Sequence, residues 1–215
     1  MNILLIESSS KIIEFAYNKN GNFVILKKLS NDRNADDLVF EMKKAFDEQG
    51  LKFSEIQYIA LSNGPGSFTG LRIGSAVAKG ICFAVKAQLI EIFTLDIIAN
   101  KAGVISDGKI IVPLIFSNSK SGEFYTCEYR FTDGTAERIS EYRVRKAEEL
   151  ETEDRIFVIN EKTDFNFPAN IKPLDLSDES SVETMYKQAL YGISKGNFSN
   201  YSESEPFYMR KFLGH

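Results

Sequence analysis

The sequence predicts an α/β protein built from two similar lobes. Two unbroken apolar runs, NILLI at 2–6 and KIIVPLIF at 109–116, are typical of strands buried on both faces of a sheet. Each run is followed by two strand-like segments joined by tight turns, and then by a helical segment and a further strand. Because this order occurs twice, we expect one lobe over residues 1–105 and a second over residues 106–215.

The N-terminal lobe is expected to place three strands before its first helix. After the opening run, IIEFAYN (12–18) and FVILKKLS (23–30) flank the turn KNGN. Residues 35–49 carry apolar side chains at helical spacing, which predicts an amphipathic helix. IQYIALS (56–62) predicts a strand that leads into a glycine-rich turn and a second helix over 71–86.

The C-terminal lobe is expected to repeat this order. EFYTCEYRF (123–131) and AERISEYRV (136–144) predict two strands around the turn TDGT, followed by a short helical piece at 147–153 and a strand at 155–160. A last amphipathic helix is expected to carry one apolar face formed by Val182, Met185, Tyr186, Ala189, Leu190 and Ile193. The order resembles the duplicated ribonuclease-H-like lobes of the actin, sugar-kinase and Hsp70 fold, with the second lobe reduced.

Composition excludes several functional classes. The net charge of −4 argues against a chain that binds nucleic acid by itself. The only histidine is His215, which leaves no zinc site of the HExxH type, and Cys82 and Cys127 suggest no disulfide or zinc framework. No apolar run approaches the roughly 18 residues of a membrane helix, and no secretory leader is recognised. We therefore expect a cytosolic protein with no histidine-based catalytic residues or metal ligands of its own, while carboxylate chemistry with magnesium stays open.

The stretch NGPGSFTGLRIG at 63–74 joins a predicted strand to a predicted helix. It lacks the GK[ST] ending of a P-loop and the third glycine of the dinucleotide fingerprint. One interpretation is an anion site, formed by the free amides at 67–69 with Arg72 one turn inside the helix. The other is structural: the glycines supply special backbone angles, and Ser67 or Thr69 caps the helix. The residues alone leave both open.

The helix after this turn has a face that can pack closely. One arc is half glycine and alanine, and consists of Gly70, Ile73, Gly74, Val77, Ala78, Ile81, Ala84 and Val85. Ser75, Lys79 and Lys86 are expected to face solvent. Phe83 also points away from the arc, between Ala76 and Gly80. Phe40 likewise lies opposite the apolar stripe of the earlier helix. Two outward phenylalanines on neighbouring helices predict a partner surface.

The wording GPGSFTGLRIG at 64–74 is more specific than a generic glycine loop. It resembles the signature of the bacterial TsaB family, also called YeaZ, of tRNA threonylcarbamoyladenosine biosynthesis. Further segments resemble the family in the same order along about residues 2–211: ILLIESSS, FTLDIIAN, SGEFYTCEY and EPFYMRK. The motif residues are Gly64, Pro65, Gly66, Ser67, Phe68, Thr69, Gly70, Arg72 and Gly74.

The resemblance implies a supporting subunit without catalytic activity. Members of the family resemble the catalytic subunit TsaD in fold and bind it through the helices of the N-terminal lobe. TsaD transfers the threonylcarbamoyl group to the adenosine beside the tRNA anticodon, and a small ATPase, TsaE, joins the complex. The resemblance also allows either a homodimer or a monomer when the chain is alone, and implies contact with tRNA only through the complex. It places the partner interface on Asp36, Asp37, Phe40, Lys44, Ala76, Lys79, Gly80 and Phe83.

Two positions depart from the family pattern. Glu7 and Asn118 stand where the family usually has aspartate, in cleft-facing turns that hold phosphate or magnesium in working members of the fold. We therefore expect no cofactor on this chain alone. ATP or ADP remains an alternative at the level of the complex, with Glu7, Ser8, Ser9 and Asn118 as possible contacts. The competing functional hypothesis is an enzyme that acts alone, either peptidase-like or a phosphotransferase.

Overall fold

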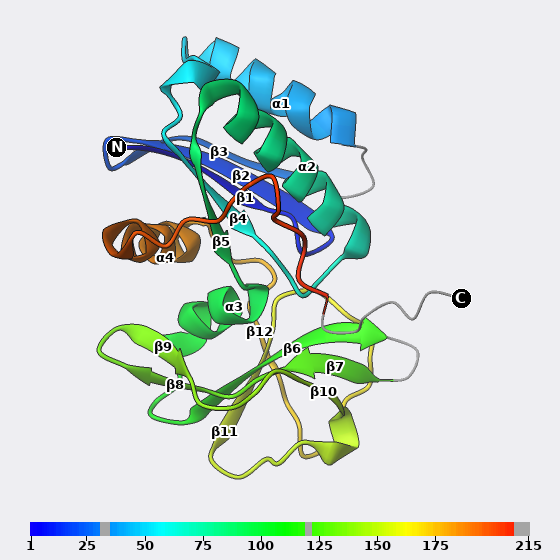
Figure 1. Ribbon diagram of the computed structural model, residues 1–215. Helices are drawn as coiled ribbons and strands as arrows, with labels where there is room; N and C mark the ends of the chain where they lie inside the picture. The colour runs from blue at the N-terminus through cyan, green and yellow to red at the C-terminus, as the bar shows by residue number, and fades with distance from the viewer. Residues whose placement is uncertain (31–34, 119–121, 209–215) are drawn as a thin grey trace. The chain divides into compact units, whose positions relative to one another are not determined.

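The computed structural model describes residues 1–30, 35–118 and 122–208. The chain forms two compact units (Figure 1). The first unit consists of Met1–Phe93 and Ser181–Pro206, and the second contains Thr94–Ser180. This division differs from the expected boundary after residue 105. The last helix, which was expected in the second lobe, belongs to the first unit.

The first unit is built on a five-stranded sheet whose strand order is β3-β2-β1-β4-β5 within the described residues. β2 pairs antiparallel with β1 and β3, whereas β4 pairs parallel with β1 and β5. The strands are β1 (Asn2–Glu7), β2 (Ile12–Lys19), β3 (Asn22–Ser30), β4 (Tyr58–Ser62) and β5 (Gln88–Ile92). β1 is buried at five of its six positions, as expected for a central strand with both faces covered.

Helices cover both faces of this sheet (Figure 1). α1 (Ala35–Glu48) and α2 (Phe68–Val85) contact each other and share one core with alternate residues of the strands, such as Leu89 of β5. α4 (Val182–Lys195) lies on the other face, where its Gly192 approaches Ile90. Successive strand residues point to opposite faces, so this change of partner from Leu89 to Ile90 assigns α4 to the far side.

The second unit repeats the strand order of the first. Its sheet has the order β10-β7-β6-β11-β12 within the described residues, with β8 paired to β6 and β9 paired to β8. β6 pairs antiparallel with β7 and parallel with β11, as β1 does with β2 and β4. The strands are β6 (Ile110–Asn118), β7 (Glu123–Thr126), β8 (Tyr129–Thr132), β9 (Thr135–Arg138), β10 (Arg143–Lys146), β11 (Arg155–Ile159) and β12 (Leu174–Asp175).

The helices are reduced in this second unit. The short 3-10 turn η2 (Ala147–Glu149) stands where α1 stands in the first unit, and residues 160–173, all described, contain no helix where α2 would be. α3 (Thr94–Gly103) packs on the opposite face, against β6, β8, β9 and β11. The predicted fold class is therefore confirmed: two ribonuclease-H-like lobes of the actin, sugar-kinase and Hsp70 type, the second one reduced.

Several elements differ from those predicted. The segment at 123–131 is divided between β7 and β8 because Cys127 and Glu128 leave the ladder. There the Cys127 Sγ donates to the Ser140 carbonyl (3.0 Å), and the Glu128 amide donates to the Ser140 Oγ (2.9 Å). The segment at 136–144 is likewise divided between β9 and β10. β5, α3 and β12 were not predicted, because these short segments lack a distinct periodicity.

The length and composition of α2 also correct the sequence analysis. Its 18 residues are apolar enough, by these two criteria alone, to cross a membrane. In the structure, however, α2 lies on β1, β4 and β5 and buries residues such as Leu71 and Cys82. This packing is that of a core helix in a globular unit. Its start also differs from the expectation, since it begins at Phe68 rather than Leu71.

Candidate functional site

The glycine turn is a compact connection between β4 and α2. Ser67 is the N-cap of α2, and its Oγ accepts a hydrogen bond from the Gly70 amide (3.2 Å). The Asn63 amide donates to the Ile92 carbonyl (2.9 Å), which ties the turn to the end of β5. Gly64 has φ +100°, a conformation that favours glycine. The capping role predicted for Ser67 or Thr69 is thus filled by Ser67.

The turn lies directly against the turn that follows β1. A Cβ atom at Gly66 would collide with the backbone oxygen of Ser9, and a Cβ atom at Gly74 would collide with the hydroxyl of Ser8. The Ser67 amide donates to the Ser9 carbonyl at 2.6 Å. These two glycines therefore allow the glycine turn and the first turns of α2 to lie directly against Ser9 and Ser8, which is the structural interpretation of the motif.

Several of the donors proposed for an anion are already used by the chain itself. The Ser9 amide (2.6 Å) and the Ser9 Oγ (2.5 Å) both donate to the Glu7 carboxylate, and the Ser8 amide donates to the Ser62 Oγ (3.0 Å). The guanidinium of Arg72 lies 3.8 Å from the centre of the Phe68 ring. A phosphate at this turn would have to displace these interactions, so a nucleotide contact at Glu7, Ser8 and Ser9 stays a prediction. The Asn118 side chain lies outside the described residues.

Glu7 is a buried carboxylate with 3% exposure. Burial raises the pKa of Glu7 above its usual range, because a charged carboxylate loses its hydration there. The hydrogen bonds from Ser9 act in the opposite direction, and Glu14 adds a smaller upward contribution. The structure therefore stores an electrostatic cost at the position where the family usually has aspartate.

The predicted partner face consists of outward residues of α1 and α2. Phe40 is 63% exposed and Phe83 is 65% exposed, as the helical periodicity predicted. Lys44, Ala76 and Gly80 are exposed as well. Asp37 is half-buried, and the side chain of Asp36 lies outside the described residues. Large exposed aromatic rings on neighbouring helices provide apolar area that a partner can cover. We call Phe40, Lys44, Ala76, Gly80 and Phe83 the helical face.

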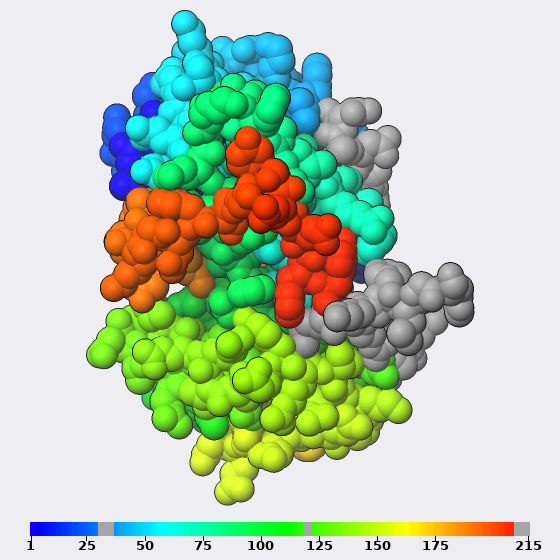
Figure 2. Space-filling model, viewed as in Figure 1, coloured from blue at the N-terminus to red at the C-terminus, as the bar shows by residue number. Residues whose placement is uncertain are grey.

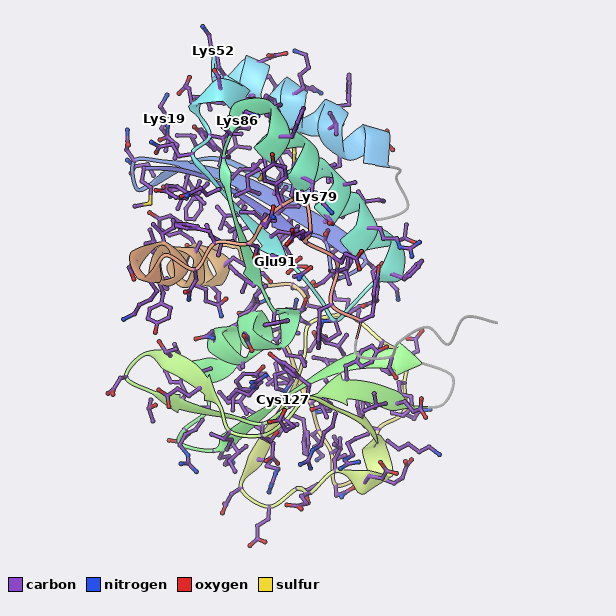
Figure 3. All side chains as sticks on the ribbon, in the orientation of Figure 1. Lys19, Lys52, Lys79, Lys86, Glu91 and Cys127 are labelled. Atoms are coloured by element: carbon purple, nitrogen blue, oxygen red, sulfur yellow. The ribbon has the colours of Figure 1, made fainter. Side chains whose placement is uncertain are left out.

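Lys79 was expected to face solvent and a partner, but it is half-buried and bonded within the unit. Its Nζ donates to the Ser204 carbonyl at 2.6 Å. The Ser204 Oγ donates in turn to Glu91 on β5 at 2.5 Å (Lys79 and Glu91 are labelled in Figure 3). Figure 2 shows the red segment after α4 lying against the teal atoms of α2. The Lys79 ammonium is therefore hydrogen-bonded to the segment around Ser204.

The buried face of α2 is rotated relative to the predicted arc. Ser75 was expected to face solvent but is 5% exposed, and Ala84 was expected inside the arc but is exposed. The buried residues of α2 are Gly70, Leu71, Gly74, Ser75, Val77, Ala78 and Cys82. The rotation arises because Ile73 and Ile81 are only partly buried at the edge of the core, while the row through Ser75 and Cys82 is covered completely.

Sequence reasoning missed Glu14, a second buried carboxylate. Glu14 is 5% exposed, accepts a hydrogen bond from the Ser181 amide (2.9 Å) and pairs with Lys28 (2.9 Å). It thereby joins β2 to the start of α4. A glutamate within the apolar run IIEFAYN was the available indication, since a buried charge in a strand requires partners.

The two cysteine thiols of the chain have low reactivity. Burial raises the pKa of the Cys82 thiol to about 11 and also raises that of Cys127. Both thiols therefore stay protonated at neutral pH and are poor nucleophiles. Within residues 1–30, 35–118 and 122–208, no group of three or more His, Cys, Asp or Glu is arranged to hold a metal ion.

Comparison with known proteins identifies the family. A family model described as TsaD: tRNA N6-adenosine threonylcarbamoyltransferase matches residues 29–203. The chain belongs to this family, on its TsaB (YeaZ) branch. It is 30% identical over 99 residues to the tRNA threonylcarbamoyladenosine biosynthesis protein TsaB of Buchnera aphidicola subsp. Acyrthosiphon pisum, which covers 46% of this chain and 45% of that protein.

Other members of the TsaB branch show the same relationship. The TsaB protein of Escherichia coli is 32% identical over 81 residues, which covers 38% of this chain and 34% of that protein. The chain thus matches less than half the length of each of these two relatives. The structure of YeaZ from Pseudomonas aeruginosa superposes with a TM-score of 0.74 at 19% identity, and covers 96% of this chain and 100% of that one. This likeness supports the fold.

Gly74→Ala tests the close approach of α2 to the turn after β1. We expect a loss of about 1–3 kcal/mol in the free energy of unfolding, because the added methyl collides with Ser8 and crowds Leu61. Gly80→Ala is the matched control on the same helix, where a Cβ meets nothing within 4 Å. It should gain about 0.5–1 kcal/mol from helix propensity. Urea unfolding of both variants measures the difference, and equal effects would contradict the packing argument.

Glu7→Gln tests the electrostatic cost at Glu7. The pKa of Glu7 is raised in the folded state above its ordinary value of 4.5. The stability contributed by protonated Glu7 is therefore fully present below pH 4.5, and it is lost as the pH rises through the folded-state pKa. Glutamine stays neutral and keeps an oxygen that accepts from Ser9. We therefore expect the free energy of unfolding of the variant, relative to the wild type, to increase as the pH rises above 4.5. The exposed Glu48→Gln is the control, and a parallel response of both variants would refute the interpretation.

Proposed function

We propose that this chain is a non-catalytic subunit that binds and supports TsaD in the formation of N6-threonylcarbamoyladenosine in tRNA. The observation that carries the proposal is the exposure of Phe40 and Phe83 on α1 and α2, at 63% and 65%. Aromatic side chains are frequent anchors of protein interfaces, where burying each ring removes a large apolar area from water. Membership of the TsaD family, on its TsaB branch, supports a TsaD-related complex and hence TsaD as the proposed partner.

The chemistry of the chain supports an accessory role. Its only histidine is His215, whereas the family resemblance implies that TsaD holds its metal through histidines. Ser9 is engaged by Glu7, and the two thiols have raised pKa values. Among the described residues, Ser9 and the two thiols are therefore not activated as nucleophiles. In this proposal TsaD carries out the transfer reaction, and this chain provides the docking surface. Both proteins are proposed to act in the cytoplasm, where tRNA is modified.

The helical face is expected to bind TsaD in preference to a second copy of this chain. The resemblance implies that family members also self-associate through this region, so both partners compete for the same aromatic side chains. TsaE is proposed as a further component of the larger complex, and tRNA is proposed to be reached through TsaD.

Replacement of both phenylalanines tests the docking surface. The double variant Phe40→Asp, Phe83→Asp should lose at least about a hundredfold in affinity for TsaD, because two aromatic anchors are replaced by charges that resist burial. Binding is measured by calorimetry with purified TsaD, and circular dichroism checks the fold. Tyr191→Asp on α4 is the matched control, since Tyr191 is also 65% exposed. Unchanged affinity in a folded double variant would remove the helical face from the proposal.

Reconstitution of tRNA modification tests the function itself. With TsaD, TsaE and the threonylcarbamoyl donor supplied, modified adenosine should accumulate over repeated turnovers only when this chain is present. The double variant should abolish this stimulation and Tyr191→Asp should preserve it. The alternative, an enzyme acting alone, predicts metal-dependent proteolysis by the purified chain, or ATP turnover that is lost in Glu7→Ala.

A further inference from the structure

The chain after α4 forms a strap over residues 198–206 of the first unit. The Ser199 amide donates to the Leu89 carbonyl at 2.9 Å, and the two residues form an antiparallel bridge. Because β5 is the last strand in the order of its sheet, this bridge covers part of an edge that would otherwise be unpaired. Tyr201 packs against the core that α1 and α2 share. The strap therefore connects the edge of the sheet with the helices that cover it.

A turn at Asn200 directs Ser204 toward the interior of the unit. The Ser204 amide donates to the Asn200 carbonyl (2.9 Å), and the Ser202 Oγ donates to the Asn200 Oδ1 (2.8 Å). Ser204 is 7% exposed, whereas Glu203 and Glu205 on either side of it are exposed. Burial of a serine between two exposed glutamates requires partners for the polar groups of that serine.

The partners of Ser204 are two charged side chains of opposite sign, Lys79 and Glu91 (Figure 3). The Ser204 carbonyl accepts a hydrogen bond from the Lys79 Nζ at 2.6 Å, and the Ser204 Oγ donates to the Glu91 carboxylate at 2.5 Å. Hydrogen bonds to charged groups are roughly twice as strong as those between neutral groups. One residue of the strap therefore ties α2 to β5.

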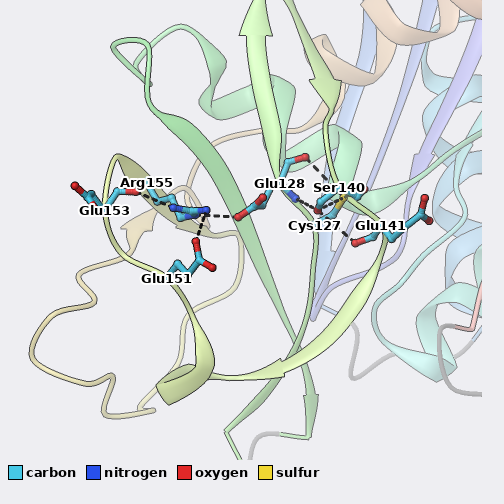
Figure 4. Close-up of polar contacts among 7 residues, drawn as sticks. All are labelled: Cys127, Glu128, Ser140, Glu141, Glu151, Glu153 and Arg155. Atoms are coloured by element: carbon cyan, nitrogen blue, oxygen red, sulfur yellow. Dashed lines mark hydrogen bonds and ion pairs between the residues drawn. The ribbon is translucent and has the colours of Figure 1, made fainter.

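Lys79 depends on this single contact, unlike Arg155 of the second unit. The Arg155 guanidinium pairs with Glu128 (2.9 Å) and Glu151 (2.8 Å) and donates to the Glu153 carbonyl (2.9 Å), so three groups fix its position (Figure 4). Among the residues that the structure describes, the Lys79 ammonium donates to the Ser204 carbonyl alone, although an ammonium group has three donors. Detachment of the strap would therefore remove the hydrogen bond that fixes Lys79.

The part of α2 that follows Lys79 is less buried than the part before it. The buried residues of α2 are concentrated before Lys79, and over residues 80–85 Cys82 alone is fully buried. Phe83 belongs to this less buried part and is four residues after Lys79, so the two side chains are neighbours on the helix surface. A restraint on Lys79 thus opposes rotation of the segment that carries Phe83.

We infer that Lys79 is a positioning residue that acts through the strap. The strap holds Lys79, Lys79 holds the C-terminal half of α2, and Phe83 is thereby kept in the orientation that docking requires. Lys79 itself does not contact TsaD in this scheme, although the family resemblance places it in the interface. The inference rests on the proposed function. Because the coupling between two binding events is reciprocal, docking of TsaD also favours the closed strap.

Hydrogen exchange of the wild-type chain tests the coupling without a mutation. The Ser199 and Ser204 amides donate to carbonyls of Leu89 and Asn200 and exchange with solvent when the strap opens. Saturating TsaD should slow the exchange of both amides by about fivefold or more, the low end of typical coupling. Unchanged exchange in the complex would overturn the inference. If the wild type does not bind TsaD at all, the proposed function fails and the inference fails with it.

An opened strap tests the effect on docking. The double variant Ser199→Pro, Ser204→Ala removes one amide and one hydroxyl that attach the strap to β5, and should weaken TsaD binding by about fivefold or more. Ser202→Ala is the matched control, because the Ser202 Oγ bonds within the strap to Asn200, and it should leave the affinity unchanged. Calorimetry measures the affinities, and circular dichroism checks the fold. Equal affinity of the wild type and the folded double variant would refute the inference and leave the proposed function standing.

Lys79→Met distinguishes positioning from direct contact with TsaD. In the otherwise wild-type chain it should weaken TsaD binding by about fivefold or more, because the ammonium that bonds to the strap is lost. In the double variant with the opened strap it should cause no further loss, since the restraint has already been removed. Two additive losses would show that Lys79 contacts TsaD directly and would refute the positioning role. Unchanged affinity in both backgrounds would refute it as well.

Discussion

The close contact between the glycine turn and the turn after β1 is the constraint on which the first unit depends. The backbone of Ser9 fills the space that a side chain at Gly66 would need, and the side chain of Ser8 fills the space that a side chain at Gly74 would need. The hydrogen bond from the Ser67 amide to the Ser9 carbonyl, at 2.6 Å, fixes the register of this contact. Since α2 starts at this point, its height and rotation over the sheet are set here, and with them the direction in which Phe83 points.

The same contact explains why a motif that resembles a phosphate loop is structural in this chain. A phosphate loop keeps its amides free for the ligand, but here the Ser67 amide bonds to Ser9 and the Gly70 amide bonds to the cap. Ser9 in turn directs its own donors to Glu7. These hydrogen bonds link the two turns to each other and to the helix cap, so the motif places the start of α2.

Sequence patterns predicted those structural features that depend on residues close together in the sequence. The apolar run of β1 and the helical spacing around Phe40 and Phe83 are local features, so the strand and the exposure of both rings were predicted correctly. Lys79 was not, because its partner Ser204 is 125 residues away. The assignment of α4 to the first unit depends similarly on Glu14, which binds the Ser181 amide across 167 residues. The register that places Arg143 of β10 opposite Thr126 of β7 is likewise not revealed by any local periodicity.

The duplicated strand order yields two different surfaces because the helices are not duplicated. In the first unit α1 and α2 bury the sheet and present their outer sides, including Phe40 and Phe83, to the surroundings. In the second unit the equivalent connection is too irregular to cover the sheet, so aromatic rings from residues 160–173 fill one part and a polar cavity remains over the other. The difference follows from hydrogen bonding: a helix satisfies its own backbone and can lie on an apolar sheet, whereas an irregular segment must keep its polar groups near water. Loss of one helix thus exposes the sheet face on which Thr126 lies.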